Sequence, residues 1–420
     1  MGGGTSYTRG AEAHLRLKQD TMVCFSLAVS ANVARRGCLF SFVRSYSATD
    51  LERWQRRCDR LAQLQRSIRF PPPQTLTVHG ETYELPLAAA EPFRTPSQEE
   101  LEYLVGFFDG DGCVSLNRQA GQMSLQVEQN VDSADVLLHF RAFLGGGVYN
   151  TRRATGSRKA TLRWSVSGTK MQEAAAALGS IPSMKLAQLQ IASAGSVALN
   201  DRALVEQKLH AFKQKHHVPR PLPNCSWPYF AGFFDADGSI CVTARGSQYV
   251  RLQLSQVNPC ILGQLQHFLH QNQLESWGLY HYAQSSVLAC GNLAECKESL
   301  ERLLANGLLV KRQQAELALN LSVENHLRTR DAISGLNGWQ ARYWRLDKEG
   351  IARATEIKRL QARIRYQVAS GLEYSSLQCQ LGELRSAHAL QNIISRCNLL
   401  RKDMRQALRE GGQVTPPLSP

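Results

Sequence analysis

Two carboxylates stand at the same place in two nearly identical stretches of the chain. Asp111 is the last acid of Leu-Val-Gly-Phe-Phe-Asp-Gly-Asp-Gly (104–112), and Asp237 is the last acid of Phe-Ala-Gly-Phe-Phe-Asp-Ala-Asp-Gly (230–238). Each stretch is typical of an apolar helix that stops at its final glycine. A carboxylate is unfavourable at a helix C-terminus, where the helix dipole is already negative. Two such ends side by side would form an oxygen-lined site for a hard divalent cation.

Each stretch also carries a small residue and a second acid. Gly106 and Gly232 would allow another backbone to approach closely, so we expect the two helices to pack on each other there. Asp109 and Asp235 lie about half a helical turn from the two terminal acids. We therefore expect them to be solvent-facing groups at the helix ends.

Further polar residues recur at the same spacing as the acids, to within one residue. Gln129 corresponds to Gln256, and Lys185 corresponds to Lys311. Each of these positions lies in a similar local sequence. Repetition of this kind indicates a tandem duplication of one supersecondary unit.

Periodicity predicts the elements that position these residues. After each helix, apolar and polar residues alternate with the period of a half-buried strand. Two such runs, joined by a turn, predict a pair of strands. A helical stretch and a second pair of strands follow, and two helices close each unit. The predicted fold class is α+β, built from tandem αββαββα repeats. The predicted helices and second strand pairs are 133–144, 147–153 and 160–167 in the first unit, and 258–271, 277–284 and 286–291 in the second.

Over residues 98–325 the chain resembles the LAGLIDADG homing endonuclease family, in its single-chain form with two repeats. The resemblance rests on the duplicated helix, glutamine and lysine. It departs from the family's Leu-Ala-Gly only at Val105 in the first motif and at Phe230 in the second, and both keep the apolar character. It implies a pseudo-two-fold monomer with a saddle-shaped antiparallel sheet that binds DNA. It also implies Mg²⁺, or Mn²⁺ in its place, on the two terminal acids. The implied catalytic set is Asp111, Asp237, Gln129, Gln256, Lys185 and Lys311, with the lysines stabilising transition-state charge or polarising water and the glutamines positioning water.

The charge of the chain agrees with a nucleic-acid partner. The net charge is +14 and the pI is about 9.4, which favours binding to phosphate but specifies no fold. Polar side chains on the open face of the sheet could read bases in the major groove of a long, asymmetric duplex target; the alternative is a solvated basic surface. The candidate DNA-binding residues are Ser115, Asn117, Gln119, Ser124, Gln126, Arg152, Arg153, Lys159 and Arg163 in the first unit, and Cys241, Thr243, Arg245, Arg251 and Gln253 in the second.

Composition shifts divide the rest of the chain. Residues 22–48 contain no acid and several arginines, which is typical of an organelle transit peptide; we favour a mitochondrion over a chloroplast. The predicted segments are a transit segment at 1–48, a linker or N-terminal extension at 49–97, the first repeat at 98–212, a linker at 213–228, the second repeat at 229–325, a basic helical extension at 326–410 and a disordered tail at 411–420.

Several classes of site are missing from the sequence. The 11 cysteines include no Cys-x-x-Cys pair and no spacing typical of zinc, and no apolar run is long enough to span a bilayer. Two functions remain: a site-specific DNA endonuclease that acts as a monomer, and a non-cleaving maturase or organelle RNA-splicing factor with intron RNA as its partner. The intact acids, glutamines and lysines favour the endonuclease.

Overall fold

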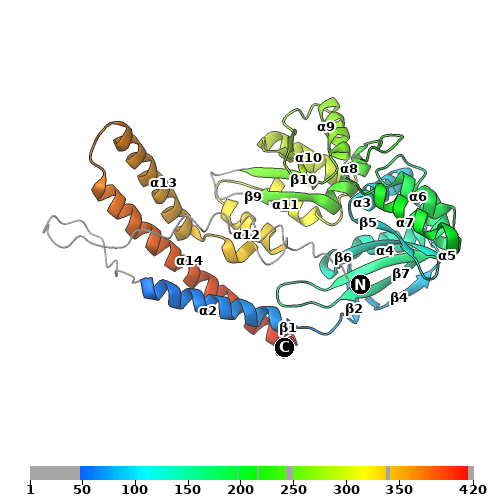
Figure 1. Ribbon diagram of the computed structural model, residues 1–420, viewed down its shortest axis with the longest axis horizontal. Coiled ribbons are helices and arrows are strands. Elements are labelled where there is room, and N and C mark those ends of the chain that lie inside the picture. The colour runs from blue at the N-terminus through cyan, green and yellow to red at the C-terminus, as the bar shows by residue number, and fades with distance from the viewer. Residues whose placement is uncertain (1–47, 196, 215–216, 243–248, 337–340, 415–420) are drawn as a thin grey trace. The chain divides into compact units, whose positions relative to one another are not determined.

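The computed structural model describes residues 48–414, apart from 196, 215–216, 243–248 and 337–340 (Figure 1). Two units of the same element order lie within this range, so the predicted α+β fold with tandem repeats is confirmed. The first contains α3 (Gln98–Asp111), β5 (Gly112–Asn117), β6 (Gln122–Asn130), α4 (Asp135–Leu144), β7 (Gly146–Arg152), β8 (Thr161–Ser167), α5 (Gly168–Leu178) and α6 (Leu186–Ser193). The second contains α8 (Trp227–Asp237), β9 (Gly238–Val242), β10 (Val250–Gln256), α9 (Cys260–Gln271), β11 (Gly278–His281), β12 (Ser286–Cys290), α10 (Leu293–Ala305) and α11 (Arg312–Leu319).

The two sheets have equivalent topologies. Their strand orders are β7-β8-β6-β5 in the first repeat and β11-β12-β10-β9 in the second, with every neighbouring pair antiparallel. On β6, Leu125 and Val127 are buried, whereas the alternating residues Ser124 and Gln126 are half-exposed. This alternation buries one face of the sheet and leaves the polar face open. Aromatic residues fill the buried side, where the rings of Phe140 and Trp164 lie 4.9 Å apart.

Helices α3 and α8 cross through their glycines and lie side by side (Figure 1). A Cβ atom at Gly106 would lie 2.0 Å from the carbonyl oxygen of Tyr229, and one at Gly232 would lie 1.9 Å from that of Tyr103. No real Cβ atom tolerates such a contact. The backbone of each helix can therefore approach the other helix this closely only at its glycine. The contacts are reciprocal, as expected of two duplicated units that face each other.

Both helices begin at a serine that caps the first turn. Ser97 accepts a hydrogen bond from the backbone N–H of Glu100, whose side chain accepts one from the N–H of Ser97. Ser226 accepts a hydrogen bond from the N–H of Tyr229 and donates one to Glu102 of the other helix, over 2.5 Å. The caps fix where each helix starts, and therefore which residue reaches its C-terminal end.

Residues 49–97, predicted as a linker or N-terminal extension, form regular structure. They contain α2 (Ala48–Ser67), β1 (Ile68–Arg69), the hairpin of β2 (Thr75–Val78) and β3 (Glu81–Glu84), and β4 (Leu87–Ala90). Strand β4 pairs with β7 and extends the first sheet to five strands. Each of these strands contains four residues or fewer, in a stretch rich in proline. Pairing with other strands, rather than local sequence, therefore determines their conformation. The predicted transit segment lies outside the described residues, except for Ala48.

The C-terminal extension contains α12 (His326–Leu336), η3 (Ala341–Trp344), α13 (Lys348–Ala369) and α14 (Ser375–Arg409). Helix α2 lies along α14 (Figure 1), and Cys58, Cys397 and Leu400 are buried between them. The predicted disordered tail needs a correction, because β13 (Gln413–Val414) pairs with β1; residues 415–420 are outside the described part of the chain.

One boundary also differs from that expected. Helix α8 starts at Trp227, inside the predicted linker 213–228, and the short helix α7 (Arg202–Ala211) precedes this linker. In the part of the chain that the structure describes, no helix combines the length and apolarity needed to cross a membrane.

Candidate active site

The C-terminal ends of α3 and α8 bring the two repeats together. Each helix stops at a glycine with extended backbone, and a Cβ at Gly112 would lie 2.3 Å from a ring carbon of Phe108. The helix therefore passes directly into a strand, with Asp111 at the junction. A Cβ at Gly110 would lie 2.9 Å from Oδ2 of Asp237, so the end of α3 approaches the acid of α8 closely.

The two terminal acids share an unfavourable electrostatic environment. Burial raises the pKa of Asp111 to about 6, and the nearby charge of Asp237 adds to the rise. Burial also raises the pKa of Asp237. Gln129 Nε2 donates to Asp111 Oδ2 and Gln256 Nε2 donates to Asp237 Oδ2, both at a distance of 2.5 Å. Two desolvated carboxylates, one of which raises the pKa of the other, form a place where a cation would be favoured.

Both predicted lysines contact the helix ends. Lys185 Nζ donates to the carbonyl oxygens of Phe108 at 2.6 Å, Asp109 at 2.8 Å and Gly112 at 2.6 Å. Lys311 Nζ donates to the corresponding carbonyl of Asp235. Each ammonium thus contacts carbonyls at a helix C-terminus and offsets the negative end of the dipole. Burial lowers the pKa of both lysines, and the neighbouring aspartates raise it in part.

The expectation that Asp109 and Asp235 face solvent is wrong. Their exposed fractions are 7% and 1%. The hydroxyl of Tyr229 donates to Asp109 Oδ2 over 2.6 Å, and that of Tyr103 donates to Asp235 Oδ2 over 2.7 Å. These carboxylates lie half a helical turn from the terminal acids, which places them on the interior side of the helix. There each accepts a hydrogen bond from a tyrosine of the other helix.

The same buried acids hold the segments that carry the lysines. Asp109 accepts the backbone N–H of Met184 at 2.7 Å and of Lys185 at 3.0 Å. Asp235 accepts the N–H groups of Leu309, Val310 and Lys311 at 2.6, 3.0 and 2.8 Å. Each acid therefore joins three elements: its own helix, the opposite helix and the N-terminus of α6 or α11.

Tyr103 and Tyr229 were not among the predicted site residues. A signal was present, because each tyrosine immediately precedes the repeated nine-residue stretch. We refer to the four residues Tyr103, Asp235, Tyr229 and Asp109 as the crossed tyrosine–aspartate pairs.

Removing either tyrosine hydroxyl should destabilise the protein. In Tyr103→Phe or Tyr229→Phe, a buried carboxylate loses one donor, which costs about 1–3 kcal/mol of unfolding free energy. Urea unfolding would measure this loss. Tyr280→Phe is the matched control, because Tyr280 is 50% exposed and should change little; equal stability of all three variants would contradict a structural role for the crossed pairs.

The raised pKa of Asp111 predicts a pH-dependent stability in the absence of metal. The pKa lies near 6 in the folded protein against 3.8 for an unperturbed carboxyl. The native state therefore binds more protons between these values, and its stability falls as pH rises through this window. In EDTA at pH 7.5, Asp111→Asn should melt a few degrees above the wild type, and the gain should vanish below about pH 4. A variant that melts lower than the wild type at pH 7.5 would contradict the electrostatic account.

The donor set fits a magnesium ion shared with a substrate. Among the described residues there is no group of three or more histidines, cysteines and acids that could enclose a metal. Asp111 and Asp237 alone supply two anionic oxygens. Mg²⁺ is commonly held by one or two carboxylates together with waters and substrate phosphates, whereas a dedicated protein cage is unusual for it.

The open face of the first sheet carries most of the predicted DNA contacts. Ser115 and Ser124 are cross-strand neighbours with their hydroxyls 2.9 Å apart, and Gln126 Nε2 donates to Ser124 Oγ over 2.9 Å. Arg163 is paired with Glu128 on the same face. Asn117 accepts the N–H groups of the turn at Gln119 and Ala120, so its side chain shapes the hairpin.

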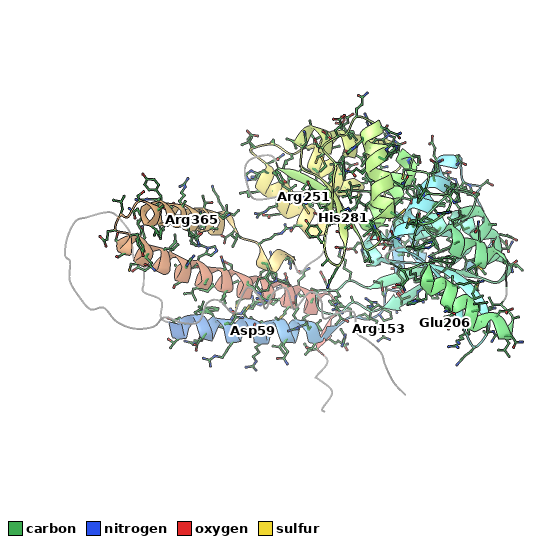
Figure 2. All side chains as sticks on the ribbon, turned by 45° about the horizontal axis from the view of Figure 1, so that its top comes forward. Asp59, Arg153, Glu206, Arg251, His281 and Arg365 are labelled. Atoms are coloured by element: carbon green, nitrogen blue, oxygen red, sulfur yellow. The ribbon has the colours of Figure 1, made fainter. Side chains whose placement is uncertain are left out.

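The basic residues of the β7–β8 hairpin fall into two groups. Lys159 pairs with Asp132 at 2.5 Å. Arg152 and Arg153 are exposed, and Arg153 lies just beyond β7 (Figure 2). These two arginines are the better candidates for contacts to phosphate.

The second sheet presents an equivalent polar face. Arg251 lies opposite Cys241 and Gln253 lies opposite Ser239 across β9 and β10. Arg251 and Gln253 are half-exposed, while Leu252 between them is buried. Figure 2 shows Arg251 projecting from this sheet. Thr243 and Arg245 lie outside the described residues.

Substitutions on these faces should separate base readout from phosphate binding. We expect Gln126→Ala and Arg251→Ala to relax sequence preference at different positions of a target, each by about 1–3 kcal/mol. Arg153→Ala should weaken binding to all sequences and lower the salt slope by about 0.9. Profiling on a randomised target library measures both effects. An unchanged profile for Arg251→Ala would count against this face.

Comparisons with known proteins give structural similarities only. No family model matches the sequence, and no curated protein matches it. Among similar solved structures, the LAGLIDADG meganuclease I-AabMI bound to uncleaved DNA is 15% identical, with a TM-score of 0.40 over 56% of this chain and 98% of that chain. The LAGLIDADG homing endonuclease I-GzeII in complex with a DNA target is 14% identical, with a TM-score of 0.40 over 56% and 96%. I-SmaMI bound to an uncleaved DNA target in the presence of calcium ions is 14% identical, with a TM-score of 0.34 over 56% and 97%.

Proposed function

We propose that the protein is a site-specific double-strand DNA endonuclease that hydrolyses phosphodiester bonds with Mg²⁺ bound between α3 and α8. The observation that carries this proposal is the meeting of Asp111 and Asp237 at two helix ends, where both carboxyls are desolvated and the charge of Asp237 raises the pKa of Asp111. Two desolvated carboxylates that meet in this way do not by themselves stabilise the fold. A divalent cation and a phosphate would turn this arrangement into a favourable one.

Each residue of the site has a task in this proposal. Asp111 and Asp237 would hold the metal, which on binding lowers the pKa of a water and stabilises the departing oxygen. Gln129 and Gln256 hold the carboxylates in orientation through their amide groups and would position water beside them. Lys185 and Lys311 place positive charge behind the acids and would favour negative charge that develops at the phosphorus.

The polar sheet faces would choose the site of cleavage. Glutamine and arginine side chains can form paired hydrogen bonds with adenine and guanine edges in the major groove. The experiment that tests the function is selection of cleaved sites from a random duplex library with Mg²⁺ present. Recovery of one defined site supports the proposal, whereas absence of any cleavage across the library would overturn it.

The second candidate is a non-cleaving maturase or organelle RNA-splicing factor with intron RNA as its partner. The observation that favours it is the basic helical extension of α12–α14, which the duplicated units do not require. A maturase would not depend on the two acids. Retention of splicing activity together with loss of cleavage in Asp237→Asn would support this second function.

A single chain should occupy each target. Both halves of the site come from one chain, and the two polar faces differ, because Ser124 in one corresponds to Arg251 in the other. We therefore expect a monomer on a long asymmetric duplex, since two-fold symmetry is required only when two identical chains meet. Light scattering on the DNA complex should give one chain per duplex. Two chains on a palindromic site would contradict the pairing of Asp111 with Asp237.

We also propose import into mitochondria, with chloroplasts as the alternative. The support is the acid-free, arginine-containing stretch within residues 1–48. A fluorescent protein fused behind these residues should enter the organelle, and diffuse fluorescence would contradict the proposal.

A further inference from the structure

Helix α13 has an open face that the endonuclease function does not use. Only Gly350 and Leu360 of its 22 residues are buried. It packs along α14 on one side, and side chains project from the other side, as Figure 2 shows around Arg365. The helix therefore presents an unusually wide surface without a protein partner among the described residues.

This surface is strongly basic. Residues 357–372 include no acid, and the exposed positive side chains are Lys358, Arg359, Arg363 and Arg365. Arg359 approaches Glu356 at 3.5 Å with 72% of its side chain exposed. In the described part of the chain the other three enter no ion pair. Three charges without an ion pair, and a fourth on an exposed side chain with one long ion pair, lie within about two helical turns and are complementary to a polyanion.

Aromatic and apolar groups lie among these charges. Tyr366 is 69% exposed and follows Arg359 and Arg363 on successive turns of the same side of the helix. Val368 and Leu372 beyond it are also more than half exposed. A duplex offers phosphates to such a face but keeps its bases stacked away from the tyrosine. Unpaired nucleotides offer both phosphates and base faces.

We propose that the outer face of α13, formed by Lys358, Arg359, Arg363, Arg365 and Tyr366, is a second nucleic-acid site that binds unpaired nucleotides of a single strand. The arginines and the lysine contact phosphates, and Tyr366 stacks on a base. This site is separate from the duplex-reading sheets and does not depend on the two acids.

The test uses the full-length protein and three fluorescein-labelled probes: oligouridylate of about 20 nucleotides, oligothymidylate of equal length, and a blunt duplex without a cleavage target. Fluorescence anisotropy should show binding of the single strands that depends on α13, whereas binding of the duplex, which the sheets supply, should not depend on it. The two single-stranded probes distinguish RNA from DNA as the source of the unpaired nucleotides. No binding to either single strand would overturn the proposal.

Two sets of variants locate the site. The triple variant Arg359→Gln, Arg363→Gln, Arg365→Gln should bind the single strands at least tenfold more weakly, with the salt slope lower by about 2. Tyr366→Ala should weaken binding about fivefold or more, whereas Tyr366→Phe should bind normally because it still stacks. The matched control on α14 is Lys402→Gln, Arg405→Gln, Arg409→Gln, which removes the same charge from exposed positions.

The control decides between a site and a general charge effect. Equal losses in the two triple variants, or unaltered binding by Tyr366→Ala, would overturn the proposal. Circular dichroism should show unchanged helix content in every variant. Duplex cleavage by the α13 variant should match the wild type, so failure of this site and failure of the proposed endonuclease activity are separate results.

Discussion

Asp111→Asn and Asp237→Asn should each abolish Mg²⁺-dependent DNA cleavage while DNA binding survives. Each change removes an anionic oxygen from the meeting point of α3 and α8 but keeps the volume of the side chain. The amide can still accept a hydrogen bond from Gln129 or Gln256. We expect the single-turnover rate to fall at least about 1,000-fold, equivalent to about 4 kcal/mol in activation free energy.

The measurement pairs single-turnover cleavage of the selected site with a gel-shift assay of the same duplex. Asp201→Asn is the control. Asp201 is an exposed acid, and its substitution removes one charge away from the C-terminal ends of α3 and α8. Ca²⁺ should support binding without cleavage, because it is larger and its coordination geometry is looser than that of Mg²⁺. Undiminished cleavage by the double Asn variant would refute the assignment of the metal to these acids.

The duplicated motif made much of the fold predictable. Helix-stopping glycines, period-two alternation and repeated spacing predict α3, α8 and the strands that follow them, because these signals are local. Strand β4 and helix α2 could not be found in this way. A four-residue edge strand such as β4 is defined by its pairing with β7, and that pairing is a contact between residues far apart in the sequence.

The error at Asp109 and Asp235 has a related cause. Helical geometry gives the angle between these acids and the terminal acids, but it does not say which side of the helix is covered. The opposite helix covers that side, and it supplies the tyrosine that makes burial of the charge tolerable. Tyrosines repeated beside the acids could have indicated a pairing across the interface.

The crossed tyrosine–aspartate pairs also explain how one interface can serve both stability and chemistry. Asp109 and Asp235 each accept a tyrosine hydroxyl and several backbone N–H groups and remain inside. Asp111 and Asp237, two residues further on, each accept one glutamine amide and meet each other. The inner acids fix the helices, and the outer acids are left for a cation. A change that alters the spacing of α3 and α8 should therefore damage both roles.

Gly106→Ala and Gly232→Ala make this spacing change directly, and each should destabilise the fold severely. The added methyl group would lie 2.0 Å or 1.9 Å from a backbone carbonyl oxygen of the opposite helix. Backbone cannot swing aside as a flexible side chain can, so the helices must separate along the whole contact. We expect a loss of at least about 3 kcal/mol of unfolding free energy, the upper end of the usual cost of overpacking.

Gly263→Ala in α9 is the matched control for these substitutions. A Cβ at this helical position would meet no atom within 4 Å. The same chemical change should there raise the unfolding free energy by roughly 0.5–1 kcal/mol, because alanine loses less conformational entropy than glycine in a helix. Urea unfolding of the three variants should thus give effects of opposite sign. If Gly106→Ala or Gly232→Ala were as stable as Gly263→Ala, the close crossing of α3 and α8, and with it the meeting of Asp111 and Asp237, would be ruled out.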